Sequence, residues 1–188
     1  MNKNIPNILT ISRFILIPFI VLALVFDKFL LAFILLTLSG LTDVLDGFIA
    51  RKFNLISNFG KLMDPLADKS TQLSILVTLA LKQTPNGETI IPLWILFIIA
   101  LKEFMMVAGA SFLYGKELVV SSKWYGKFTT VLFYMAIVSS LIISYFDLNY
   151  RFDTYLYYLG LAMTIFSLIM YFKSFYAEGY LKDINKTK

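Results

Sequence analysis

The residues of this sequence best suited to chemistry are two pairs of aspartates placed beside strongly apolar segments. Asp43 and Asp46 are three residues apart, and Asp64 and Asp68 are four residues apart. On an α-helix, either spacing places both carboxylates on one face. Because only a short turn separates the two segments, they are expected to form antiparallel neighbouring helices whose acidic faces meet near the membrane surface.

The cost of inserting these carboxylates limits what they can do. An aspartate at the centre of a membrane helix costs about 2.5–3.5 kcal/mol, so four cost on the order of 10 kcal/mol even if some lie off-centre. Crowded anions also repel one another, so the cluster should face water, cations or both. Carboxylate oxygens suit hard divalent ions, and two such ions would clamp a diphosphate. The sequence has neither His nor Cys, which leaves acid–base and metal chemistry to carboxylates.

Small and basic residues accompany the aspartates. Gly47 and Ala50 lie on the face of the first pair, and Gly60 lies on the face of the second, where they leave room for a bulky ligand. Arg51 offers a forked donor for phosphate oxygens. Taken singly, the small residues are typical of helix packing, and Arg51 could simply flank a span. Their combination favours a metal and phosphate site, with a cation channel or proton relay as the non-enzymatic alternative.

The composition predicts the elements that position these residues. Of the 188 residues, 59% are hydrophobic and 15% are charged, whereas a soluble domain has about 25% charged residues. An all-α, polytopic membrane protein is expected, with a single domain over residues 1–188. Six apolar segments approach the ~20 residues of a spanning helix, namely 9–26, 29–50, 62–81, 91–114, 127–146 and 154–175. Residues 1–12 are mildly amphipathic and predict a short interfacial helix before the first span, rather than a signal peptide.

The basic residues predict the orientation. Six spans place both termini on one side, and all but three of the 17 Lys and Arg residues fall there; the exceptions are Lys28, Lys82 and Arg151. The positive-inside rule then places both termini and the aspartates in the cytoplasm, with the protein in the plasma membrane. The net charge of +5 fits an anionic membrane surface or a phosphate-bearing substrate better than nucleic acid.

The complete acidic pattern resembles the signature of the CDP-alcohol phosphotransferase family. It reads D-x-x-D-G-x-x-A-R-x₈-G-x-x-x-D-x-x-x-D, and its fixed positions are Asp43, Asp46, Gly47, Ala50, Arg51, Gly60, Asp64 and Asp68. The resemblance implies transfer of a substituted phosphate from a CDP-linked donor to an alcohol, with release of CMP. It also implies a homodimer that uses Mg²⁺ or Mn²⁺, as two ions.

By this resemblance, each residue of the pattern has an expected role. Asp43, Asp46 and Asp64 would bind metal. Asp68 would contact the second metal and act as the base that takes the proton of the acceptor hydroxyl, since it lies one turn beyond Asp64 and could reach outward. The residues expected to hold the CDP moiety are Asp46, Gly47, Ala50, Arg51 and Gly60.

The identity of the acceptor depends on weaker patterns. Residues 4–13, NIPNILTISR, and residues 64–69, DPLADK, resemble the corresponding segments of phosphatidylglycerophosphate synthases, and related cardiolipin synthases share much of them. The acceptor would be glycerol 3-phosphate in the first case and phosphatidylglycerol in the second. A phosphate dianion requires several cations, and the candidates are Arg13, Lys69, Lys102, Lys123 and Lys127.

The same region also departs from the pattern of phosphatidylglycerophosphate synthases. Lys102 stands where arginine is typical, and no arginine follows two turns later. Lys102 could instead pair with Glu103, and Lys123 and Lys127 could be positive-inside anchors. Fewer fixed cations leave room for a lipid acceptor.

The sequence therefore predicts a phosphatidyltransferase of phospholipid biosynthesis. CDP-diacylglycerol is the expected donor, because its acyl tails can stay in the bilayer while the headgroup reaches the cytoplasmic aspartates. Glycerol 3-phosphate is the favoured acceptor, and phosphatidylglycerol, as used by cardiolipin synthases, is the alternative. A carboxylate-lined cation channel or transporter is the alternative from a different class.

Overall fold

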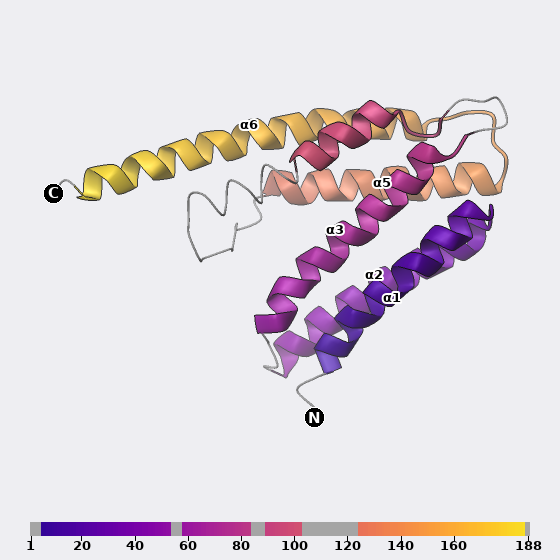
Figure 1. The fold of residues 1–188 in the computed structure, drawn as a ribbon, viewed down its shortest axis with the longest axis horizontal. Helices are drawn as coiled ribbons and strands as arrows, with labels where there is room; N and C mark the ends of the chain where they lie inside the picture. Colours follow the sequence, from indigo (N-terminus) through magenta and orange to yellow (C-terminus); the bar gives the residue numbers. More distant parts are fainter. Residues whose placement is uncertain (1–4, 54–57, 84–88, 103–123, 187–188) are drawn as a thin grey trace. The chain divides into compact units, whose positions relative to one another are not determined.

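The computed structural model describes residues 5–53, 58–83, 89–102 and 124–186 (Figure 1). Its helices are α1 (Ile5–Val25), α2 (Phe29–Lys52), α3 (Asn58–Leu81), α5 (Trp124–Tyr145) and α6 (Asp153–Lys186), with a further helical segment over Leu93–Lys102. Within these ranges the only β-type pairing is an isolated bridge between Gln83 and Thr89. The predicted all-α class is confirmed.

Four candidate membrane spans mark the chain as an integral membrane protein. They are Ile8–Val25, Phe29–Ile49, Trp124–Tyr145 and Asp153–Tyr171, and they agree within a few residues with four of the six predicted spans. The 24 residues of α3 could also cross a bilayer at about 1.5 Å per residue. However, every stretch of α3 that is long enough contains Asp64, Asp68 and Lys69, so its composition does not mark it as a span. The count of six spans is not confirmed, since residues 103–114 of the fourth predicted span also lie outside the described ranges.

The N-terminal residues form no separate interfacial helix in the described part of the chain. Helix α1 is continuous from Ile5 to Val25, so residues 5–12 are the first turns of the helix that makes the first span. The predicted interfacial element is therefore not confirmed. At its other end α1 closes with Asp27 in the left-handed region (φ 58°), and Lys28 N–H donates to the carbonyl of Ala23 at 2.8 Å. This is the bonding of a Schellman cap, and α5 ends in the same way at Asp147 (φ 50°).

Residue contacts divide the chain into two compact units. The first comprises Met1–Ile91 with Ile137–Arg151, and the second comprises Pro92–Ala136 with Phe152–Lys188. In the first unit the most extensive helix contacts are those of α1 with α2 and of α1 with α3 (Figure 1). The buried residues of α1 include Thr10, Arg13, Ile20 and Leu24, at the spacing of one helix face. That face carries polar residues towards the start of α1 and apolar residues towards its end.

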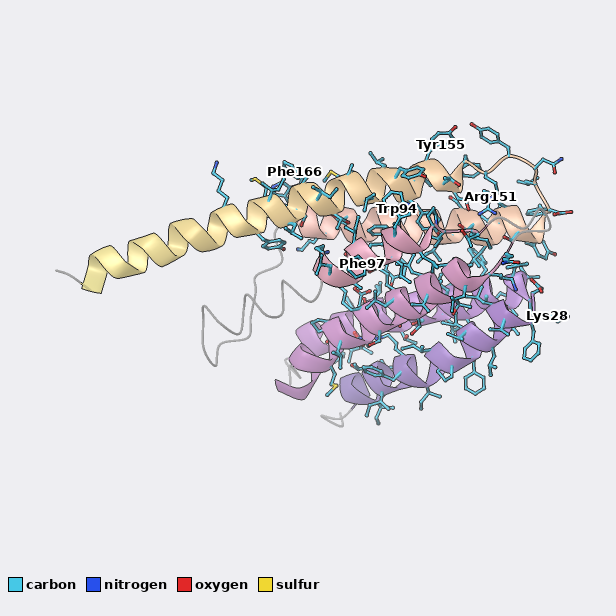
Figure 2. All side chains as sticks on the ribbon, turned by 45° about the horizontal axis from the view of Figure 1, so that its top comes forward. Lys28, Trp94, Phe97, Arg151, Tyr155 and Phe166 are labelled. Carbon is cyan, nitrogen blue, oxygen red and sulfur yellow. The ribbon has the colours of Figure 1, made fainter. Side chains whose placement is uncertain are left out.

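In the second unit, α5 and α6 approach closely where a glycine of α6 faces an aromatic ring of α5. A Cβ atom at Gly160 would lie 3.0 Å from the ring of Phe133, so a larger residue would push the helices apart. Large side chains such as Trp94, Tyr155 and Phe166 are exposed on this unit (Figure 2). Such exposure is expected where a helix faces lipid rather than water.

Candidate active site

Helix α1 joins the two predicted pairs of aspartates. Arg13, on its buried face, forms ion pairs with Asp43 and Asp46 of α2 and with Asp64 of α3. The distance from Arg13 Nη2 is 3.3 Å to Asp46 Oδ2 and 3.1 Å to Asp64 Oδ1, while Nη1 contacts Asp43 Oδ1. One guanidinium group therefore gathers carboxylates from two other helices.

The hydroxyl group of Thr10 forms a second link between the same helices. Thr10 Oγ1 donates to Asp64 Oδ1 at 2.7 Å and lies 3.5 Å from Asp46 Oδ2. Since a hydroxyl has one hydrogen to donate, the shorter contact is the stronger bond. Thr10 is almost fully buried. Sequence reasoning missed Thr10, and the only signal for it was its position one turn before Arg13 on the same helix face.

The aspartate cluster is buried where it contacts α1, whereas two of its carboxylates are exposed. The side chains of Arg13 and Asp46 are 3% and 4% exposed, whereas those of Asp43 and Asp64 are 49% and 40% exposed. Asp43 and Asp64 therefore keep carboxylate surface that a ligand can reach. In the described part of the chain, α1 contacts both α2 and α3 and links their acidic residues through Arg13.

The donor set fits a divalent metal ion. Asp68 lies one turn after Asp64, and both lie close enough for their charges to act on Asp43. The carboxylate oxygens of these aspartates are hard donors, which divalent ions prefer. Their negative charges also exceed the single positive charge of Arg13. Among the described residues no three acidic side chains are arranged to share one ion, and the guanidinium of Arg13 contacts three of the four carboxylates.

The residues predicted to hold CDP lie on α2 and α3. Gly47 is half-buried on α2, and Gly60 is buried near the start of α3. Ala50 and Arg51 belong to the last turns of α2, and their side chains lie outside the described part of the structure. The backbone positions are thus those expected on the two acidic helices.

The lysines predicted to bind the acceptor are divided between the units. Lys69 directly follows Asp68 on α3 and is half-buried. Lys102 is buried at the end of the segment Leu93–Lys102, and Lys127 is exposed on α5; both belong to the second unit. Lys123 lies outside the described residues. Arg13, another of the predicted acceptor-binding residues, forms ion pairs with Asp43, Asp46 and Asp64.

The structure is thus that of a helical membrane protein in which aspartates of α2 and α3 converge on Arg13 of α1. The family model for CDP-alcohol phosphatidyltransferase matches residues 3–168, which include α1 and the whole acidic pattern. The chain belongs to the CDP-alcohol phosphatidyltransferase family, as the resemblance predicted.

Individual curated relatives are similar to this chain over different shares of its length. A CDP-diacylglycerol–glycerol-3-phosphate 3-phosphatidyltransferase from Aquifex aeolicus (strain VF5) is 33% identical over 147 residues, covering 78% of this chain and 80% of the relative. A protein of the same name from Rickettsia prowazekii (strain Madrid E) is 41% identical over 118 residues, covering 59% and 64%. A cardiolipin synthase (CMP-forming) / mitochondrial hydrolase fusion protein from Schizosaccharomyces pombe (strain 972 / ATCC 24843) is 35% identical over 115 residues, covering 61% and 18%.

Proposed function

We propose that this protein is a CDP-diacylglycerol-dependent phosphatidyltransferase that uses glycerol 3-phosphate as acceptor and releases CMP. The observation that carries the proposal is the convergence of Asp43, Asp46 and Asp64 on one cationic group. The Aquifex relative, which matches most of both chains, supports the choice of donor and acceptor.

The position of the aspartates suits a lipid donor. Asp43 and Asp46 occupy the last turns of the candidate span Phe29–Ile49. A headgroup can reach them while its acyl chains stay beside the exposed apolar residues of α2, such as Leu38 and Leu41. Gly47 and Gly60 leave space for the nucleotide, and the guanidinium of Arg51 would bind phosphate oxygens.

The aspartates would also hold two divalent ions, Mg²⁺ or Mn²⁺. Asp43, Asp46, Asp64 and Asp68 are the residues proposed to bind them. When bound, the ions neutralise the diphosphate and the departing CMP. The protein's own contribution is position: Thr10 and the helix contacts fix Asp46 and Asp64, so little reorganisation is needed during the reaction.

Asp68 is the proposed base. It would accept the proton of the acceptor hydroxyl as that oxygen forms a bond to the phosphorus of the phosphatidyl group. The bond from this phosphorus to CMP breaks in the same displacement, and CMP leaves with the electron pair. The half-buried position of Asp68, one turn beyond Asp64, leaves it accessible to an acceptor.

The acceptor phosphate would bind to basic residues of the chain, with Arg13, Lys69, Lys102, Lys123 and Lys127 as candidates. A cardiolipin synthase reaction, with phosphatidylglycerol as acceptor, is the second candidate function. It is favoured by the lysine at position 102 and by the similarity to the fission yeast relative.

The test is a parallel assay of purified protein with CDP-diacylglycerol and Mg²⁺ or Mn²⁺. Glycerol 3-phosphate, phosphatidylglycerol, inositol phosphate and serine are offered separately, and both CMP and the lipid product are measured. The proposal expects CMP and phosphatidylglycerophosphate with the first acceptor only, and none after chelation of the metal. Cardiolipin would identify the alternative enzyme, and metal-dependent ion flux without CMP would identify a channel or transporter.

Asp68→Asn tests the proposed base. The variant should lose transfer while CDP-diacylglycerol still binds, because the amide keeps the shape of the side chain and cannot accept the proton. Normal turnover by this variant would exclude Asp68 as the base.

We also propose a single-domain, multi-pass homodimer in the plasma membrane with both termini and the active site in the cytoplasm. Two of the basic residues assigned to the outer side lie at the end of α1: Lys28 follows Asp27 directly (Figure 2), and Lys82 forms an ion pair with Asp27. The aspartate cluster contacts Arg13, near the start of α1. Labelling of cysteines introduced at either end, from one side of sealed vesicles, tests this orientation.

A further inference from the structure

The aspartate cluster contains a cation supplied by the chain itself. The guanidinium of Arg13 is buried and contacts Asp43, Asp46 and Asp64. Among the described side chains that contact one another here, three carboxylates face one guanidinium, so the negative charges outnumber the positive one. The Nε atom of Arg13 is also buried and has no hydrogen-bond partner among the described residues. The ion-pair network is therefore incomplete in both charge and hydrogen bonding.

Arg13 and a divalent ion would compete for the same three carboxylate groups. The guanidinium contacts Asp43 Oδ1, Asp46 Oδ2 and Asp64 Oδ1. A divalent ion draws its carboxylate ligands in to about 2.0–2.6 Å, much closer than the 3.1 Å and 3.3 Å separations around Arg13 Nη2. Two cations so close together would also repel. A divalent ion that binds these carboxylates would therefore weaken their contacts with the guanidinium.

We propose that Arg13 is the resident counter-cation of the metal-free site and that divalent ions displace it from the aspartates. The displaced guanidinium then binds a phosphate group of the substrate. This inference rests on the proposed function, since it takes Asp43, Asp46 and Asp64 as metal ligands.

The displaced side chain needs a new anion. A buried guanidinium without a partner carries a large desolvation cost, so it must move to water or to another negative group. A phosphate matches its forked donors, and the unpartnered Nε atom supplies one more N–H for the new site. Metal binding and phosphate binding are therefore coupled, with the metal first. Thr10, which is neutral, keeps its bond to Asp64 during the exchange.

Metal affinity without substrate is the decisive measurement. Full-length protein is stripped of metal, placed in lipid nanodiscs, and titrated with Mn²⁺ while free Mn²⁺ is followed by electron paramagnetic resonance. Arg13→Gln removes the competing charge, so its Mn²⁺ affinity should rise by about tenfold or more. Lys82→Gln, which removes an ion pair at the other end of α1, should leave the affinity unchanged. An affinity of Arg13→Gln equal to or below that of the wild type would overturn the proposal.

Arg13→Lys covers the case in which the glutamine variant does not fold. One ammonium group cannot reproduce the fork that contacts three carboxylates, so Mn²⁺ should bind about threefold more tightly than to wild type. An unchanged affinity would count against the exchange. Thermal unfolding adds a second readout: Mn²⁺ should raise the melting temperature of Arg13→Gln more than that of wild type, because its metal-free form has lost the counter-cation.

Binding of glycerol 3-phosphate tests the second step. Wild-type protein should bind it measurably only when Mn²⁺ is present, and Arg13→Gln should weaken this binding about tenfold. Equal binding with and without Mn²⁺ would exclude the coupling. A protein that shows the Arg13 effect on Mn²⁺ but never releases CMP would overturn the proposed reaction alone. A protein that releases CMP but shows no Arg13 effect would overturn only the exchange.

Discussion

A basic side chain lies against each end of α1, and the two differ in the number of carboxylates that they contact. At one end Arg13 is buried among three carboxylates. At the other end Lys82 Nζ lies 2.8 Å from Asp27 Oδ1 and donates to the carbonyl of Leu24 at 2.9 Å. Lys82 is 16% exposed and Asp27 is 68% exposed, so this pair is partly in water.

This difference in charge distinguishes the contact of Lys82, which stabilises the fold, from the contacts of Arg13, where further cations can bind. Lys82 meets one carboxylate and the carbonyl end of α1, where a positive charge is favourable, so its charge is matched. Arg13, whose side chain is 3% exposed, contacts three carboxylates, two of which are partly exposed to water. Unmatched buried charge is costly, and it makes the first end a site for further cations. Substitutions of the same kind at the two ends should therefore have different effects.

The largest difference is expected for carboxylate-to-amide substitutions. Asp46→Asn removes a charge from the cluster and should lower CMP release by about 10³-fold or more, because charge stabilisation is the main catalytic contribution. Asp27→Asn makes the same change at the Lys82 end and should alter the rate less than about twofold. Initial rates at saturating CDP-diacylglycerol check both. Comparable losses in the two variants would show that the ends are not functionally distinct.

A smaller effect is expected at Thr10. Thr10→Val keeps the shape of the side chain but removes the bond to Asp64, which should lower CMP release about tenfold, while Thr10→Ser should retain most activity. Thr78→Val is the matched control on α3, because its hydroxyl bonds to the backbone carbonyl of Ser74. If Thr78→Val lost as much activity as Thr10→Val, the link to Asp64 would not be the cause.

At the Lys82 end the expected effect is on stability. Lys82→Met should lower the free energy of unfolding by about 1 kcal/mol, because α1 loses a cation at its C-terminal carbonyls together with a partly exposed ion pair. The melting temperature should fall by roughly 2–4 °C without a change in metal affinity. A changed metal affinity would mean that this end communicates with the aspartates.

The smallest effect on stability is expected at the two aspartates that end helices in the left-handed conformation. Asp147→Gly should stabilise the protein by about 0.5–1 kcal/mol, because glycine adopts positive φ without strain. Asp27→Gly should gain less, since it also loses the ion pair with Lys82. Thermal melts of both variants at equal detergent concentration make the comparison. A larger gain at Asp27 would show that its pair with Lys82 contributes nothing.

Much of the fold was predictable because hydrophobicity alone specifies membrane helices. Four predicted spans agree with the structure, since runs of apolar residues can satisfy their backbone groups in lipid only as helices. Helix α3 was also predicted as a helix, but the charges of Asp64, Asp68 and Lys69 keep it from being a span by composition. Whether it spans depends on packing that hides these charges. The interfacial helix is not confirmed, because α1 is continuous from Ile5 to Val25.

By itself the sequence determined which residues form the acidic pattern, on which helices they lie, and the family to which the chain belongs. The spacing of the residues was enough for this, because in a regular helix the position in the sequence fixes the face on which a side chain lies. Tertiary structure decided that α1 contacts both α2 and α3 and links the two pairs, and that Arg13 and Thr10 contact Asp64. Contacts between helices depend on how side chains of distant segments fill shared space, and no spacing within one segment encodes that.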